Sequence, residues 1–193
     1  GYSSADAVAR AVAQRHCASL TESRLSDIGV FQQGSQWWVL LAQPFEPPAA
    51  AQADDVAARV LELVNQARGQ PRRCGDQSFG AAPPLRLDPR LAQAAQVHSR
   101  DMARRGVLEH RGGDGSQVAE RVERAGYDWG SVAENIASGQ ENPQEVVAGW
   151  LRSPGHCVNI MDPRVTDMGL AYVVDPASPA GIYWTQVFGR VRR

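Results

Sequence analysis

The chain has 193 residues, 43% of them hydrophobic, and its formal net charge at pH 7 is −1. This length and composition suit one packed domain with a small addition, and they exclude an intrinsically disordered chain. No run of eighteen apolar residues is present, so no transmembrane segment is predicted. All basic residues are arginines, but they are scattered and form no stripe that would bind nucleic acid.

The first 46 residues predict a helical segment followed by a β-hairpin. Gly34-Ser35 is the expected tight turn between the two strands, because glycine adopts turn conformations at no steric cost. The second strand carries Trp37 and Trp38 and continues with an apolar run. We expect this hydrophobic hairpin to contact a protein partner.

An internal similarity links this segment to the end of the chain. Residues His16–Val30 align without a gap onto His156–Leu170, with five identical positions and six conservative ones. One hypothesis is that residues 1–46 are a degenerate partial copy of the C-terminal part of the following domain. The alternative is chance similarity between two helix–turn–strand segments.

A proline-rich stretch separates the two parts of the chain. Between Pro44 and Ala53 the paired prolines are incompatible with helix and with central strand. The sequence therefore predicts an appendage at 1–46, a linker at 47–53 and the main domain at 54–193.

The main domain begins with helix signals and ends with strand signals. Asp54 is the expected N-cap of a first helix that ends at Gly69, and residues 71–84 are an expected loop. Asp88-Pro89 and Asn142-Pro143 are cap-and-proline pairs that open further helices. The remaining predicted elements are a helix from about 116 to 126, a short helix from 153, and strands at 132–137, 168–174 and 182–188. This order favours a mixed α/β fold.

Three of the four histidines lie in short motifs that follow one another along the chain. The motifs are His98-Ser-Arg-Asp101-Met102, Glu109-His110 with Asp114-Gly115-Ser116, Ala133-Glu134-Asn135-Ile136-Ala137, and Ser153-Pro-Gly-His156-Cys157. The set and its order resemble the CAP superfamily, also called SCP/TAPS or PR-1-like, and especially its bacterial single-domain branch. The resemblance runs from about Asp54 to Gly189 and implies a three-layer α-β-α sandwich.

The resemblance also implies a site. His98, His110, Glu134 and His156 would line a binding cleft, with His98 and His156 as ligands of zinc or another divalent cation. Two departures are visible, because Tyr183 stands where the family has a strand histidine and Ser153 where it has a glutamate. The structural alternative is a hydrogen-bonded core histidine and a glutamate that fixes loops.

Three functions follow from this resemblance. The first is a secreted or periplasmic module that binds a divalent cation, a small apolar ligand or a lipid. The second is an interaction scaffold that uses the N-terminal hairpin. The third is a metal-assisted hydrolase with Glu134 as base beside His98 and His156.

The three cysteines allow one disulfide and leave one thiol. Because the bacterial relatives are usually exported, we expect a Cys74–Cys157 bond, which leaves Cys17 either free or paired with a second chain. Three reduced thiols are the alternative.

Overall fold

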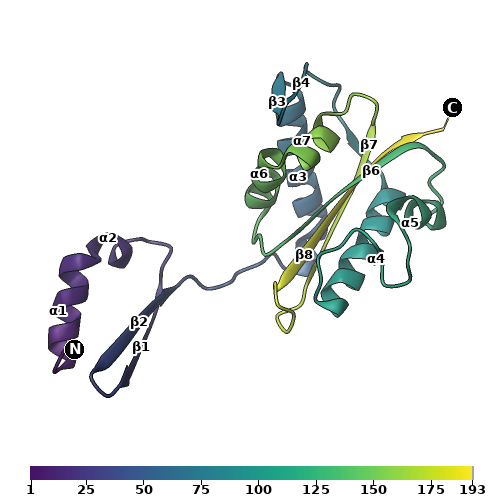
Figure 1. The fold of residues 1–193 in the computed structure, drawn as a ribbon. Coiled ribbons are helices and arrows are strands. Elements are labelled where there is room, and N and C mark those ends of the chain that lie inside the picture. Colours follow the sequence, from purple (N-terminus) through teal and green to yellow (C-terminus); the bar gives the residue numbers. More distant parts are fainter. Residues whose placement is uncertain (193) are drawn as a thin grey trace. The chain divides into compact units, whose positions relative to one another are not determined.

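The computed structural model describes residues 1–192 and divides the chain into two compact units, Gly1–Glu46 and Pro47–Arg193 (Figure 1). None of the described helices is long and apolar enough to cross a bilayer.

The first unit contains the predicted helix and hairpin. Ser4 caps the first helix, because its hydroxyl oxygen accepts a hydrogen bond from the backbone N–H of Ala7. Gly34 lies in the tight turn with a φ of +59°, a conformation that favours glycine. The elements in chain order are α1 (Ala5–Arg15), α2 (Cys17–Leu20), β1 (Asp27–Gln33) and β2 (Gln36–Ala42).

The second unit is the predicted three-layer sandwich, with a four-stranded sheet between helices (Figure 1). The strand order is β5 (Arg86–Leu87), β7 (Asp167–Val174), β8 (Ile182–Val191), β6 (Trp129–Ser138). The β5–β7 pair is parallel and the other pairs are antiparallel. The helices are α3 (Ala53–Arg68), α4 (Pro89–Arg105), α5 (Val118–Arg124), α6 (Pro143–Arg152) and α7 (Pro154–Met161).

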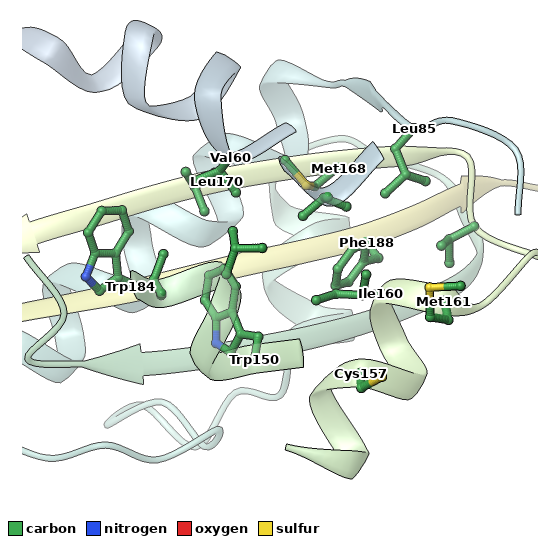
Figure 2. Close-up of a cluster of buried hydrophobic side chains, with 14 of the residues drawn as sticks. Val60, Leu85, Trp150, Cys157, Ile160, Met161, Met168, Leu170, Trp184 and Phe188 are labelled. Carbon is green, nitrogen blue, oxygen red and sulfur yellow. The ribbon is translucent and has the colours of Figure 1, made fainter. Parts of the chain in front are cut away.

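The larger core lies between the sheet and the helices α3, α6 and α7. Alternate residues of β7 point to this side, because side chains alternate across a strand. Figure 2 shows Met168 and Leu170 from β7 among the side chains of this core, together with Trp150 from α6 and Trp184 from β8. Both tryptophans are almost completely buried, and they are the largest of the buried side chains in this core.

The helix α4 covers the opposite face of the sheet at very short range. A Cβ atom added to Gly169 would lie 2.1 Å from the backbone carbon of Leu91, so only glycine leaves room for this helix. Farther along, the hydroxyl of Ser99 lies 2.8 Å from the hydroxyl of Thr185 on β8. These contacts fix the position of α4 against the sheet, and they therefore also fix where its side chains lie.

Three segments differ from the sequence predictions. The helix α3 begins at Ala53 with Gln52 as its N-cap, and not at Asp54, because a short 3₁₀ helix (Ala50–Gln52) runs directly into it. Residues 47–53, expected as a linker, belong to the second unit, where the Tyr172 hydroxyl donates to the carbonyl of Ala49. The expected loop at 71–84 contains a short hairpin, β3 (Arg72–Cys74) with β4 (Gln77–Phe79).

The expected disulfide between Cys74 and Cys157 is present, and Cys17 is free and exposed. The bond joins β3 to α7, the helix that carries His156. It therefore fixes one wall of the domain next to a residue of the predicted cleft.

Candidate functional site

Glu134 is the centre of a buried polar cluster. In β6, Glu134 pairs with Val187 of β8, and like Val187 it points to the side of the sheet that α4 covers. The Glu134 side chain is 2% exposed there. Its Oε1 atom lies 2.9 Å from Nδ1 of His110, and its Oε2 atom accepts a hydrogen bond from Nη2 of Arg121 at 2.7 Å. Both carboxylate oxygens thus have a partner.

Arg121 is a functional candidate that the sequence analysis missed. It projects from α5 and also donates to the carbonyl oxygens of Ser116, at 2.8 Å, and His110, at 3.2 Å. The signal was present in the sequence, because Arg121 lies on the same helix face as Val118 and Ala125. A charged residue on the apolar face of a helix indicates a buried partner of opposite charge.

Asp101 holds the loop between His110 and Ser116 against α4. The backbone N–H of Gly113 donates to its carboxylate at 2.8 Å. Arg105 bridges the same two segments, because it donates to both Asp101 and the carbonyl of Arg111. The acidic residue of the first motif therefore positions the loop that presents His110.

His98 points from α4 into the cluster and is completely buried. Its Nε2 atom lies 3.7 Å from Oε1 of Glu134, beyond hydrogen-bond distance. Among residues 1–192, neither ring nitrogen makes a hydrogen bond of normal geometry, although the main chain of Glu109 lies near enough to act on the ring. Burial lowers the pKa of His98 and Arg121 lowers it further, whereas Glu134 and the main chain of Glu109 act in the opposite direction. The ring is therefore neutral near pH 7.

His156 lies near His110 but is not bonded to the rest of the cluster among the described residues. It is carried by α7, and its carbonyl accepts a hydrogen bond from Asn135, which points to the opposite face of β6 from Glu134. Burial and the nearby charge of His110 lower the pKa of His156. Within the described chain, no hydrogen bond or ion pair joins its ring to Glu134 or His98. The structure thus brings together His98, His110 and Glu134, and leaves His156 at the edge.

The two departures from the family pattern contribute no ligand. Tyr183 is buried on the α4 side of β8, where it packs with Met102 and Ile136. Ser153 lies at the junction of α6 and α7 as the cap residue of both helices.

A pocket of about 300 Å³, whose lining residues are mostly polar or charged, adjoins the cluster. Its wall includes both His98 and Arg121, and the Nε atom of Arg121 has no hydrogen-bond partner in the described part of the chain. The outer face of α4 and the loop that carries Ser116 complete the lining. The pocket therefore lies against the two residues whose buried nitrogen atoms are unpaired.

The residues as placed do not fit a divalent cation. In the described residues, no three His, Cys, Asp or Glu side chains are grouped to hold a metal ion. Both oxygens of Glu134 have partners, and the guanidinium of Arg121 already supplies positive charge 2.7 Å away. A second cation there would meet strong repulsion in a poorly screened environment. Metal binding by His98 and His156 stays a prediction.

Comparison with known proteins identifies the family. The model of the cysteine-rich secretory protein family, CAP, matches residues 61–188. The chain belongs to this family. Its CAP domain is similar to the Bacillus subtilis protein YkwD, with 33% identity over 130 residues that make up 67% of this chain and 45% of YkwD.

Solved structures with a similar fold include two bacterial surface or extracellular proteins. One is an extracellular protein containing an SCP domain from Bacillus anthracis, with a TM-score of 0.61 and 24% identity over 80% of this chain and 47% of that one. Another is an outer surface protein of Borrelia burgdorferi, with a TM-score of 0.54 and 18% identity over 70% of this chain and 89% of that one. The chain spans less than half the length of YkwD and of the Bacillus anthracis protein.

Proposed function

We propose that this chain is an extracellular binding module whose CAP domain holds a small polar ligand beside Glu134. Two similar proteins are described as extracellular and as an outer surface protein, which supports this location. The disulfide between Cys74 and Cys157 is of a kind that persists in oxidising compartments.

The observation that carries the proposal is the unpaired imidazole of His98. Buried polar groups are almost always hydrogen-bonded, and each one left unpaired costs about 1–3 kcal/mol. His98 has two such atoms and Arg121 has one, and both residues line the same pocket. A bound molecule with oxygen acceptors would pair with Nε of Arg121 and with the protonated nitrogen of His98. A small carboxylate or phosphate has this chemistry.

The test is a titration with sodium acetate and with inorganic phosphate, followed by NMR of the His98 ring and the Arg121 Nε–H group. We expect saturable shifts at both groups in the wild-type chain, and in His98→Asn the shift of the remaining Arg121 Nε–H signal should be lost. His16→Asn is the matched control, because His16 lies in the first unit. Shifts that are absent, or that persist in His98→Asn, would contradict the proposal.

The divalent cation predicted from the sequence is an alternative that the same protein can test. Zinc titration by calorimetry should give no stoichiometric binding if the charge of Arg121 repels the ion. Tight zinc binding that is lost in both His98→Ala and His156→Ala would restore the cation as the ligand.

A small apolar ligand is a second candidate, because a groove of about 450 Å³ lies between α3 and α4. Its lining includes Leu87, which is 42% exposed, together with Leu170 and Tyr172 from β7. Palmitate is a suitable probe, and Leu87→Asp should weaken its binding. Leu108→Asp is the control, because Leu108 is an exposed apolar residue of the second unit outside this groove.

A hydrolase has the least support. A general base needs an accessible carboxylate, whereas Glu134 is 2% exposed and both of its oxygens have partners.

A further inference from the structure

The first unit has too little core to be complete. Val8 is its one buried residue among residues 1–46. One face of its hairpin carries Phe31, Trp38 and Leu40, which are 62%, 46% and 68% exposed. Chains of this size depend on a disulfide, a metal or a partner for stability. The unit has the apolar surface of a larger domain but lacks the elements that would cover it.

The order of its elements is that of the second half of the CAP domain. Two helices and two antiparallel strands follow one another as α1, α2, β1, β2, and the same sequence is α6, α7, β7, β8. The strand register agrees as well. Asp27 pairs with Ala42 as Asp167 pairs with Gly189, and the same offsets relate all seven residue pairs of β1–β2 to pairs of β7–β8.

A side-chain hydrogen bond is also repeated. The equivalent tryptophans are Trp37 in β2 and Trp184 in β8. Trp37 donates its indole N–H to the carbonyl of Tyr2 at 3.2 Å, and Trp184 donates to the carbonyl of Gln140 at 2.8 Å. Each acceptor lies three residues before the first residue of α1 or α6. Chance similarity between two short segments does not account for agreement in sequence, register and this contact.

The open face of the hairpin corresponds to the face that α4 covers in the CAP domain. Gly29 is the counterpart of Gly169 in both sequence and register. At Gly169 an added Cβ would collide with the backbone of α4, whereas at Gly29 it would meet only Cβ of Leu40, at 3.9 Å, among the described atoms. The glycine at which a helix can approach is therefore retained, and no helix of residues 1–46 covers it.

We infer that residues 1–42 form the second half of another CAP-type domain, and that the Gly29 face docks a first half through a helix of the α4 type. The residues beside Gly29 specify that helix. In α4, Ser99 bonds to Thr185 and to the carbonyl of Ala171. Trp38 and Phe31 replace Thr185 and Ala171 here, so the docking helix carries a small residue opposite Gly29 and an apolar residue in place of Ser99.

The test uses the full chain and a labelled peptide that copies residues 86–107 with the substitution S99A. Fluorescence anisotropy should show saturable binding to the wild-type chain. Gly29→Leu should weaken binding about tenfold or more, because the added side chain occupies the place of the helix backbone. Gln32→Leu places the same leucine side chain on the opposite face of β1 and should leave binding unchanged.

Circular dichroism checks that Gly29→Leu folds, as the open space around Gly29 predicts. Absence of saturable binding, or equal binding to Gly29→Leu, would overturn the inference. Sedimentation gives a further outcome. If the chain does not bind the peptide but forms a dimer that Gly29→Leu dissociates, the occupant of this face is a second copy of the chain. That result would also overturn the inference.

Discussion

Arg121 and Glu134 form an ion pair that is buried on both sides, with Nη2 and Oε2 2.7 Å apart and both side chains 2% exposed. The pair joins α5 to β6 across the base of the loop that carries His110. Removing one member leaves the other charge buried without compensation, which typically costs about 3–5 kcal/mol. The ion pair is therefore a determinant of both the stability of the domain and the position of His110.

Arg121→Met should lower the free energy of unfolding by about 3 kcal/mol or more, measured by urea denaturation. Arg59→Met is the control, because its partner Glu62 is on the same exposed helix face and such pairs contribute less than about 1 kcal/mol. Equal losses of unfolding free energy in the two variants would show that the buried pair stabilises the domain no more than the exposed one.

Acidification should destabilise the CAP domain through His98. Burial lowers the pKa of this histidine, so below about pH 6.5 the unfolded chain binds a proton that the folded domain does not. Stability therefore falls as the pH drops from 7.5, by up to about 1.4 kcal/mol per pH unit for this group. Unfolding free energies of wild type and His98→Asn between pH 7.5 and 5.5 should show a smaller slope in the variant. A slope that is unchanged in His98→Asn but reduced in His16→Asn would contradict this account.

The disulfide should contribute strongly, because Cys74 and Cys157 are separated by 83 positions in the sequence. The loop-entropy relation gives about 4.5 kcal/mol for a loop of this length. Cys157→Ser should therefore lower the thermal unfolding temperature markedly, whereas Cys17→Ser, which removes the exposed free thiol, should leave it unchanged. If reduction of the wild-type protein had no effect on its unfolding temperature, this prediction would be wrong.

Two equivalent glycines provide a matched pair of substitutions. Gly169→Ala forces a Cβ against the backbone of α4 and should cost about 3 kcal/mol, because a packed helix backbone cannot move aside easily. Gly29→Ala introduces the same atom into open space and should be neutral or slightly stabilising. Differential scanning calorimetry of both variants distinguishes the effects, and similar losses in both would contradict the close packing of α4.

The sequence predicted much of the fold because its signals are local. The cap-and-proline pair at Asp88 opens α4 as expected, and Asn142 caps α6 by accepting a hydrogen bond from the N–H of Glu145. The short hairpin near Cys74 was missed, because each of its strands has three residues and no alternating pattern.

The site was harder to predict because its geometry depends on distant contacts. The motifs indicated Glu134 and three histidines. They did not indicate that Glu134 and Asn135, which are adjacent in β6, point to opposite faces of the sheet, or that Asn135 donates to the carbonyl of His156. Arg121 belongs to no motif. Its place on the apolar face of α5 indicated a buried charge, but not that Glu134 of β6 would be its partner. Side-chain pairing across elements is a tertiary property that spacing along the chain does not determine.

The order of strands in the sheet also constrains how the CAP domain forms. Its two edge strands, β5 and β6, come from earlier parts of the chain than the central hairpin of β7 and β8. Neither edge strand pairs with another strand of this sheet until that last hairpin arrives. Such non-local pairing slows folding and leaves edges exposed during synthesis. The sheet of the domain can therefore assemble only after its final hairpin emerges. A chain truncated before Asp167 would present unpaired strand edges to chaperones and proteases.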